Sequence, residues 1–140
     1  MQKEGIRELF YLWIKQKYII HNKKFNKKLF FREREIWWLE MEKNVGVEIN
    51  GKNTFFERPV LVLKKYNKEM CFVLPLTTQI KYPLPSYQIK ILTQGKEKSA
   101  VNLTQGRCVS SKRLLRKIKT IDKATYNTVV YRFKDQFKIH

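Results

Sequence analysis

The side chains of this sequence argue against catalysis by a metal ion, a histidine pair or a hydrolase triad. Metal-assisted hydrolysis needs clustered carboxylates, yet only two aspartates occur, Asp122 and Asp135, both near the C-terminal end. The two histidines, His21 and His140, stand in a lysine-rich segment and at the last position. A phosphate-cradling Gly-rich loop and a triad-hydrolase motif are both missing. Any catalysis must therefore use Arg, Lys, Glu, Ser, Thr or Tyr, and we expect no metal or other cofactor.

The positive charge of the chain favours an acidic partner. Thirty Lys and Arg against twelve Asp and Glu give a formal net charge of +18. Nucleic acid, an anionic membrane and an acidic protein are all compatible with this charge. No apolar run approaches the roughly 20 residues that span a bilayer, so we expect no membrane partner and a cytoplasmic protein. The isolated Cys71 and Cys108 are expected to be reduced there, unless the fold brings their strands together.

The first thirty residues differ from the rest of the chain. Helical spacing of apolar residues predicts a helix to about Ile20, and a lysine-rich connector follows it. We expect its apolar stripe to pack against the body of the protein, with an oligomer or partner contact as the alternative. The stripe consists of Ile6, Leu9, Phe10, Trp13, Ile14 and Tyr18. The sequence thus divides into residues 1–30, a helix and basic connector, and residues 31–140, a separate domain.

The remainder of the chain is predicted to be mainly β with a C-terminal helix. Short hydrophobic runs bounded by turn residues predict strands, and Asp122 can cap the last helix. Closely spaced short strands with few helices favour a small, strongly bent barrel. Of Trp37 and Trp38, we expect one core and one surface residue rather than a base-stacking platform. The predicted strands are Glu35–Met41, Pro59–Leu63, Met70–Leu76, Tyr87–Leu92, Ser99–Cys108 and Leu115–Ile118, and the helix face is Tyr126, Val129, Val130, Phe133 and Phe137.

Six segments, in order along the chain from Arg34, resemble the MazF/PemK family of bacterial toxins. They correspond to the family's opening Gly/Glu-aliphatic-Trp strand, its Gly-x-Glu-x-x-Gly loop, its Arg-Pro-Val strand, its Pro-x-Thr-[Ser/Thr] strand end, and its later Ser-x-Val and Gln-aliphatic-Arg/Lys elements. In this sequence they read Arg34-Glu35-Ile36-Trp37-Trp38, Gly46-Val47-Glu48 with Gly51-Lys52, Arg58-Pro59-Val60-Leu61-Val62, Pro75-Leu76-Thr77-Thr78-Gln79, Ser99-Ala100-Val101 and Gln105-Gly106-Arg107.

The resemblance implies an SH3-like barrel of the MazF/CcdB type that forms a homodimer and cleaves single-stranded RNA without a metal ion. In that mechanism the substrate's own 2′-hydroxyl attacks the phosphate and leaves 2′,3′-cyclic phosphate and 5′-hydroxyl ends. Arg58 would donate to the scissile phosphate, Thr77 would hold a phosphate oxygen, and Glu48 would orient Arg58 or act as base. An antitoxin with an acidic segment would block the groove. The resemblance also implies a set of RNA-binding residues: Lys52, Thr78, Gln79, Lys81, Gln105 and Arg107.

Two features depart from the family pattern and two other functions stay open. Gly106 stands where the family usually has an aliphatic residue, and the loop from Asn50 to Glu57 is longer than in the shortest members. Both bear on which RNA sequence is preferred. A non-catalytic toxin like the CcdB gyrase poisons is one alternative, although such relatives lack the Arg/Thr pair. A basic RNA-binding module without cleavage is the other.

Overall fold

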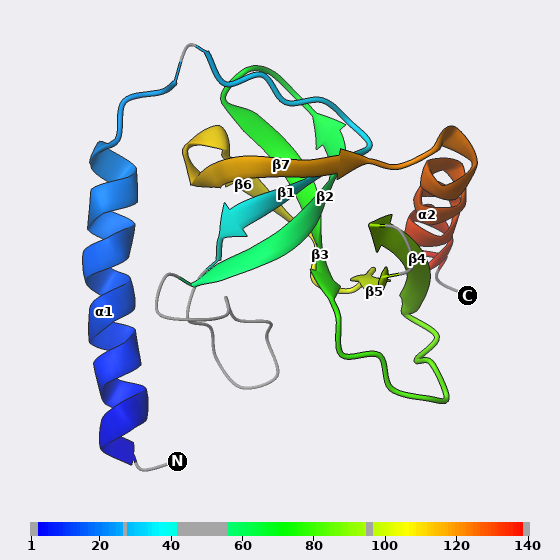
Figure 1. Cartoon of the computed structure of the whole chain (residues 1–140), viewed down its shortest axis with the longest axis horizontal. Coiled ribbons are helices and arrows are strands. Elements are labelled where there is room, and N and C mark those ends of the chain that lie inside the picture. The colour runs from blue at the N-terminus through cyan, green and yellow to red at the C-terminus, as the bar shows by residue number, and fades with distance from the viewer. Residues whose placement is uncertain (1–2, 27, 42–55, 95–96, 139–140) are drawn as a thin grey trace.

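The computed structural model describes residues 3–26, 28–41, 56–94 and 97–138, which form a bent antiparallel sheet flanked by two helices (Figure 1). Helix α1 (Lys3–Asn22) precedes the sheet and helix α2 (Lys123–Asp135) follows it. A short 3-10 helix, η1 (Ser111–Arg113), joins the last two strands. The strands are β1 (Glu35–Glu40), β2 (Glu57–Lys65), β3 (Met70–Thr77), β4 (Gln88–Gln94), β5 (Glu97–Asn102), β6 (Arg107–Ser110) and β7 (Leu114–Thr120).

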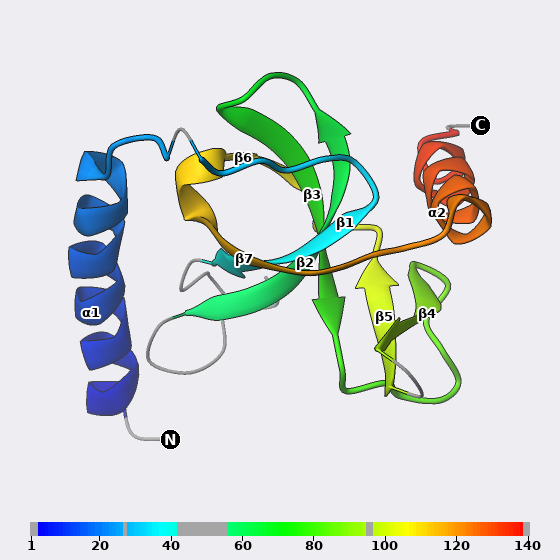
Figure 2. The same ribbon diagram turned by 45° about the horizontal axis from the view of Figure 1, so that its top comes forward.

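Strand β3 is the centre of the sheet because it pairs with three other strands. The main strand order is β4-β5-β3-β2-β1-β7, and β6 pairs with β3 beside this path. One edge of β3 pairs with β2, while the other edge pairs first with β6 and then, at Leu76 and Thr77, with β5. This sharing turns the β4–β5 hairpin out of the main sheet, toward α2 and away from α1 (Figure 2). The mainly β, bent-barrel architecture predicted from the sequence is confirmed.

Helix α2 covers one of the two main apolar clusters of the sheet. Asp122 caps it as predicted, since its carboxylate accepts a hydrogen bond from the Thr125 backbone N–H at 3.0 Å. Val129 is fully buried, and Tyr126, Val130 and Phe133 pack around it. Four of the five residues predicted for the apolar face of this helix are therefore confirmed, whereas Phe137 lies beyond the end of the helix and is 63% exposed.

The second cluster lies on the other side of the strands. It includes the buried residues Phe31, Trp37, Val62 and Leu114. Trp37 is 6% exposed, whereas Trp38 is only partly buried and lies under the guanidinium of Arg116, 5.1 Å from the ring centroid. The expectation of one core and one surface tryptophan holds.

Helix α1 contacts the sheet with only part of the predicted stripe. Trp13 and Ile20 are buried and pack with Leu9 and Phe56, and the Trp13 and Phe56 rings meet edge to face at 5.3 Å. Ile14 and Tyr18, by contrast, are 61% and 71% exposed. The prediction that the whole stripe packs on the body was wrong. The face of α1 that contacts the sheet carries Leu9, Trp13 and Ile20, which leaves Ile14 and Tyr18 on the exposed side. None of the described helices combines the length and apolar character needed to cross a membrane.

Polar contacts at Glu40 fix the position of α1. This buried carboxylate at the end of β1 accepts hydrogen bonds from the Gln16 amide at 3.1 Å and from the Lys23 ammonium at 3.4 Å. The ammonium of Lys112 in η1 donates to the His21 carbonyl at 3.0 Å. The bond to Glu40 holds Gln16 on the face of α1 that contacts the sheet, between Trp13 and Ile20. The buried face of the helix is therefore not its most apolar face.

The strand predicted over Ser99–Cys108 is two strands in the structure. Strand β5 ends at Asn102 and β6 begins at Arg107. The Asn102 side-chain oxygen accepts hydrogen bonds from the Thr104 backbone N–H at 2.8 Å and from its hydroxyl at 2.7 Å. This local turn ends the strand. The remaining strand predictions correspond to observed strands, with ends shifted by up to two residues.

The two cysteines are free thiols that point to opposite faces of the sheet. Strands β3 and β6 are neighbours, with Cys71 opposite Val109 and Phe72 opposite Cys108. Adjacent residues of a strand alternate between faces, so the two thiols cannot meet although their strands do. Cys71 is buried and Cys108 is exposed.

A buried carboxylate stabilises the start of β1. Glu35 accepts hydrogen bonds from the Arg32 backbone N–H at 2.7 Å and the Trp37 indole at 3.1 Å, and the Lys117 ammonium lies 2.9 Å from it. Burial alone raises the pKa of Glu35. The hydrogen bonds from Lys117, Trp37 and Arg32 more than offset that effect, so its pKa lies below the ordinary value of 4.5.

We expect Glu35→Gln to lower the free energy of unfolding at pH 7 by about 1–3 kcal/mol, because buried donors lose a charged acceptor. A depressed folded-state pKa means that the wild-type contribution is present above the unfolded pKa and is lost as the pH falls through the folded value. Urea unfolding between pH 7 and pH 2 should therefore show a wild-type advantage that shrinks in acid. Asp135→Asn, at an exposed carboxylate, serves as the control. A pH-independent difference for Glu35→Gln would contradict this assignment.

Candidate active site

The register of β2 and β3 brings Arg58 to Thr77. Val60 pairs with Pro75, and continuing this antiparallel register by two residues places Arg58 beside Thr77, the last residue of β3. The Arg58 guanidinium donates a hydrogen bond to the Leu76 carbonyl at 3.0 Å. Thus Arg58 and Thr77, nineteen positions apart in the sequence, meet at one end of the strand pair.

Arg58 is a half-buried cation. Its burial lowers the pKa of the guanidinium below its ordinary value, but arginine stays protonated at neutral pH. Partial removal of water strengthens the interaction of this charge with a bound anion. The carbonyl of Leu76 holds one edge of the planar group, and this fixes its orientation toward the adjoining cavity.

The cavity beside Arg58 has a volume of about 320 Å³ and gathers five residues that were predicted as site residues. Strands β2 and β3 provide Arg58 and Thr77, the segment between β3 and β4 provides Gln79 and Lys81, and the turn before β6 provides Gln105. The backbone N–H of Gln79 donates to the Thr77 hydroxyl oxygen at 3.2 Å. A hydroxyl that accepts this bond keeps its own proton available for a phosphate oxygen.

Of the four other predicted residues, two are described and do not line this cavity, and two lie outside the described residues. Thr78 is exposed and does not line the cavity. Arg107 begins β6, where it pairs with Val73, and is not among the lining residues. Glu48 and Lys52 lie outside the described residues.

The structure adds four lining residues that the sequence did not indicate: Pro85, Tyr87, Gln88 and Asn102. Gln88 and Asn102 face each other across β4 and β5. Asn102 is 5% exposed, a burial that is unusual for an amide. In the sequence this wall corresponds to the Tyr82-Pro83-Leu84-Pro85 segment, which interrupts regular structure, and to the predicted strand that begins at Tyr87. Neither pattern indicates a site.

The electrostatics of the cavity suit an anion. Arg58 and Lys81 contribute positive charge, and the described residues that line it include no Asp or Glu. Groups of three or more His, Cys, Asp or Glu that could hold a metal ion do not occur within residues 3–26, 28–41, 56–94 and 97–138. What this arrangement can do chemically is bind a phosphate and stabilise negative charge on it.

A cysteine nucleophile does not fit either. Burial raises the pKa of the Cys71 thiol to about 12, so this residue is an unreactive thiol at neutral pH. Cys108 is exposed on β6 and does not line the Arg58 cavity. The chemistry of the cavity therefore rests on arginine, lysine, hydroxyl and amide groups.

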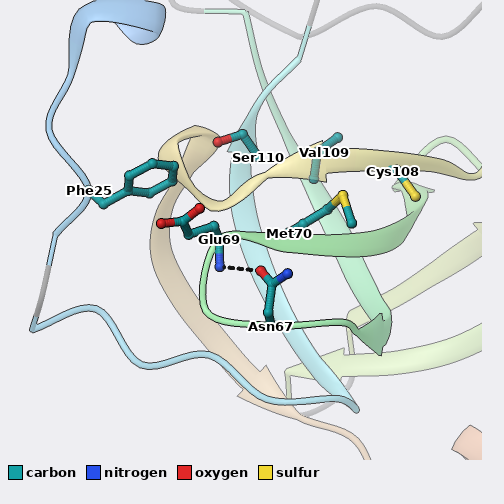
Figure 3. Close-up of a pocket in the computed structure, with 7 residues that line it drawn as sticks. All are labelled: Phe25, Asn67, Glu69, Met70, Cys108, Val109 and Ser110. Carbon is teal, nitrogen blue, oxygen red and sulfur yellow. Dashed lines mark hydrogen bonds between the residues drawn. The ribbon is translucent and has the colours of Figure 1, made fainter.

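A second cavity, of about 370 Å³, has the opposite character (Figure 3). The carboxylate of Glu69 lines it together with apolar groups such as Phe25 and Met70. The backbone N–H of Glu69 donates to the Asn67 side chain at 2.8 Å, which holds the β2–β3 turn at its rim. Its described lining contains no Lys or Arg, and a carboxylate repels phosphate. This cavity is thus a poor candidate for nucleic acid, and the Arg58 cavity is preferred.

Gly106 is required by packing behind the cavity. A Cβ atom at this position would lie 2.6 Å from a ring carbon of Phe72 and 2.7 Å from a methyl group of Leu74. The Phe72 ring is itself held against Phe133 at 5.4 Å. Phe72 fills the space of an aliphatic side chain at position 106, so this departure from the family pattern is a matter of packing.

Comparison with known proteins gives a consistent result. Residues 32–137 match the family described as PemK-like, MazF-like toxin of type II toxin–antitoxin system. No curated protein sequence matches the chain.

Two solved structures share the fold. A Mycobacterium tuberculosis toxin, MazF-mt6, is 15% identical, with a TM-score of 0.57 over 76% of this chain and 99% of that one. An endoribonuclease from a mycobacterial species, solved in complex with its cognate antitoxin, is 9% identical, with a TM-score of 0.56 over 79% and 100%.

We expect Gly106→Ala to lower the free energy of unfolding by about 1–3 kcal/mol, the usual cost of overpacking. The variant Phe72→Leu should relieve the clash, so the loss in the double variant should be smaller than the sum of the two single losses. Urea unfolding of the four proteins measures this coupling. Strict additivity would show that the two positions do not compete for one space.

Proposed function

The chain belongs to the family of PemK-like, MazF-like toxins of type II toxin–antitoxin systems, and we propose that it is a metal-independent endoribonuclease acting on single-stranded RNA. The observation that carries the proposal is the shared cavity of Arg58 and Thr77, a cationic site without a described carboxylate. A phosphodiester fits this chemistry. The net charge of +18 would attract RNA to the surface around it.

In the proposed reaction the RNA supplies its own nucleophile. The 2′-oxygen attacks the adjacent phosphorus, the bond from phosphorus to the 5′-oxygen breaks, and the products end in a 2′,3′-cyclic phosphate and a 5′-hydroxyl. The Arg58 guanidinium donates to a nonbridging oxygen and stabilises the negative charge that develops there. The Thr77 hydroxyl holds a second oxygen. No step requires a metal or a protein nucleophile, in agreement with the residue types that surround the cavity.

The remaining groups have supporting roles in this proposal. Gln79, Lys81 and Gln105 line the cavity and would bind the substrate next to the reacting phosphate. Thr78 and Arg107 would contact RNA outside the cavity, as would Lys52. Glu48 would orient Arg58 or accept the 2′-hydroxyl proton.

The proposal extends to partners and location. One of the structures with this fold is an endoribonuclease bound to its cognate antitoxin. We infer that this chain is likewise held silent by an antitoxin, whose acidic segment would complement the charge of +18. We also propose a homodimer in the cytoplasm, where RNA is available and the two free thiols stay reduced. The division into residues 1–30 and 31–140 forms part of this proposal.

Arg58→Ala is expected to lower the rate of RNA cleavage about a hundredfold to a thousandfold, because one charged donor to the transition state is removed. Arg58→Lys should fall between this variant and the wild type, since it keeps the charge and loses the planar fork. Thr77→Val should lower the rate about tenfold, the effect of one hydrogen bond. The assay uses a mixed-sequence single-stranded RNA in EDTA. The cyclic phosphate end is identified by its resistance to alkaline phosphatase, and the 5′-hydroxyl end by its direct phosphorylation by a polynucleotide kinase.

Arg7→Ala, at an exposed arginine on α1, is the matched control and should cleave like the wild type. An RNA substrate left intact by the wild type at high enzyme concentration would overturn the proposal. Such a result would move the assignment to a non-catalytic toxin or a binding module on the same fold.

A further inference from the structure

Two exposed tyrosines stand next to the Arg58 cavity. Tyr87 forms part of its wall and is 43% exposed. Tyr82 follows the lining residue Lys81 and is 68% exposed. Neither ring is needed to fill the described apolar clusters. Exposed aromatic rings beside a cationic groove are the usual platform on which the bases of a single strand stack.

Two lysines of the β4–β5 hairpin, Lys90 and Lys98, extend the positive charge beyond the cavity on one face of the hairpin. Gln88 pairs with Asn102, Lys90 with Ala100, and Leu92 with Lys98. Side chains two residues apart on a strand share a face. The face that presents Gln88 and Asn102 to the cavity therefore presents Lys90 about 7 Å further along, and Lys98 beyond it.

Lys90 joins this row to Tyr82. Its ammonium donates to the Tyr82 hydroxyl at 2.6 Å and lies 5.2 Å from the ring centroid. The cation thus sits at the hydroxyl end of the ring and leaves the ring faces accessible. The hydrogen bond and the charges of Lys90 and Lys98 lower the pKa of the Tyr82 hydroxyl, which places both lysines within electrostatic reach of this ring.

The segment that carries the tyrosines is held in place by its neighbours. The Leu103 backbone N–H donates to the Tyr87 carbonyl at 2.8 Å, and the Gln88 N–H donates to the Pro85 carbonyl at 3.0 Å. The guanidinium of Arg132 in α2 donates to the Ser86 carbonyl. A platform fixed in this way loses little conformational freedom when a ligand stacks on it.

We propose that Tyr87, Tyr82, Lys90 and Lys98, here named the tyrosine track, bind the nucleotides next to the scissile phosphate on one side. The two rings stack on bases and the two ammonium groups bind the phosphates between them. This inference rests on the proposed function and deepens it. It assigns a binding site beyond the reacting phosphate, one that reads single strands through their unpaired bases and not through a duplex groove.

The test separates binding from cleavage by using a single-stranded 2′-deoxy oligonucleotide beside RNA of the same sequence. The deoxy strand lacks the attacking hydroxyl and reports affinity alone, by fluorescence anisotropy. Tyr82→Ala and Tyr87→Ala should each weaken its binding about five- to hundredfold. Tyr82→Phe and Tyr87→Phe keep the rings and should bind within about twofold of the wild type. With RNA, Tyr82→Ala should raise KM by a similar factor and leave kcat within about twofold, because its ring lies outside the cavity wall.

A second experiment tests whether Lys90 and Lys98 contact phosphates. The double variant Lys90→Ala/Lys98→Ala should reduce the slope of log affinity against log salt by about 1.4, or about 0.7 for each lost phosphate contact. Matched controls are Tyr18→Ala and Lys15→Ala/Lys28→Ala, which remove exposed groups of the same types from α1 and the connector. Both controls should bind like the wild type, and thermal melting should show every variant folded.

The outcomes distinguish this inference from the proposed function. A wild type that cleaves RNA, with unchanged affinity and salt slope in the track variants, would overturn the track and leave the ribonuclease standing. A wild type that cleaves nothing, but whose DNA affinity falls in Tyr82→Ala and is kept in Tyr82→Phe, would support the track and overturn the ribonuclease. Loss of affinity in Tyr82→Phe equal to that in Tyr82→Ala would exclude stacking.

Discussion

The register between β2 and β3 is the constraint on which the site depends. With Val60 opposite Pro75, the strand pair ends with Arg58 next to Thr77, and the Leu76 carbonyl holds the guanidinium. A slip by one residue would turn every side chain of β2 to the other face. That slip would exchange Val60 and Val62 with Leu61 and Leu63 between the two apolar clusters and remove Arg58 from the cavity, so the packing on both faces of β2 also fixes the geometry of the site.

The double pairing of β3 has a second consequence for the site. Because β6 and β5 share one edge of β3, the chain must turn between them over residues 103–106. That turn depends on the Asn102 side chain and on Gly106, whose missing Cβ leaves room for Phe72. It also brings Gln105 and Asn102 to the cavity. Packing of Phe72 behind the sheet and the shape of the anion site are therefore linked through one glycine.

The sequence allowed prediction of the elements but not of every surface they form. Continuous apolar runs such as Val60–Leu63 and the Asp122 cap are local signals, and both were read correctly. The Asn102 turn was missed because an asparagine followed by three residues and a glycine can occur inside a strand as well as at its end. The docked face of α1 was misjudged because Gln16 lies on it, held by Glu40 from a distant strand. Motif resemblance indicated Arg58 and Thr77, whereas Tyr87 and Gln88 come from a segment without any motif and become site residues only when β4 folds beside β5.

The distribution of acidic residues leaves the lining of the Arg58 cavity positively charged. Several described carboxylates are engaged in structural ion pairs: Glu35 with Lys117, Glu40 with Lys23, and Glu57 with Arg116. These pairs hold β1 and β2 to their neighbours and neutralise cations away from the site. The described residues that line the Arg58 cavity include no Asp or Glu. The burial that lowers the Arg58 pKa also raises its preference for a bound anion. The Leu76 carbonyl that accepts a hydrogen bond from Arg58 is a neutral group, so this contact orients the guanidinium without neutralising its charge.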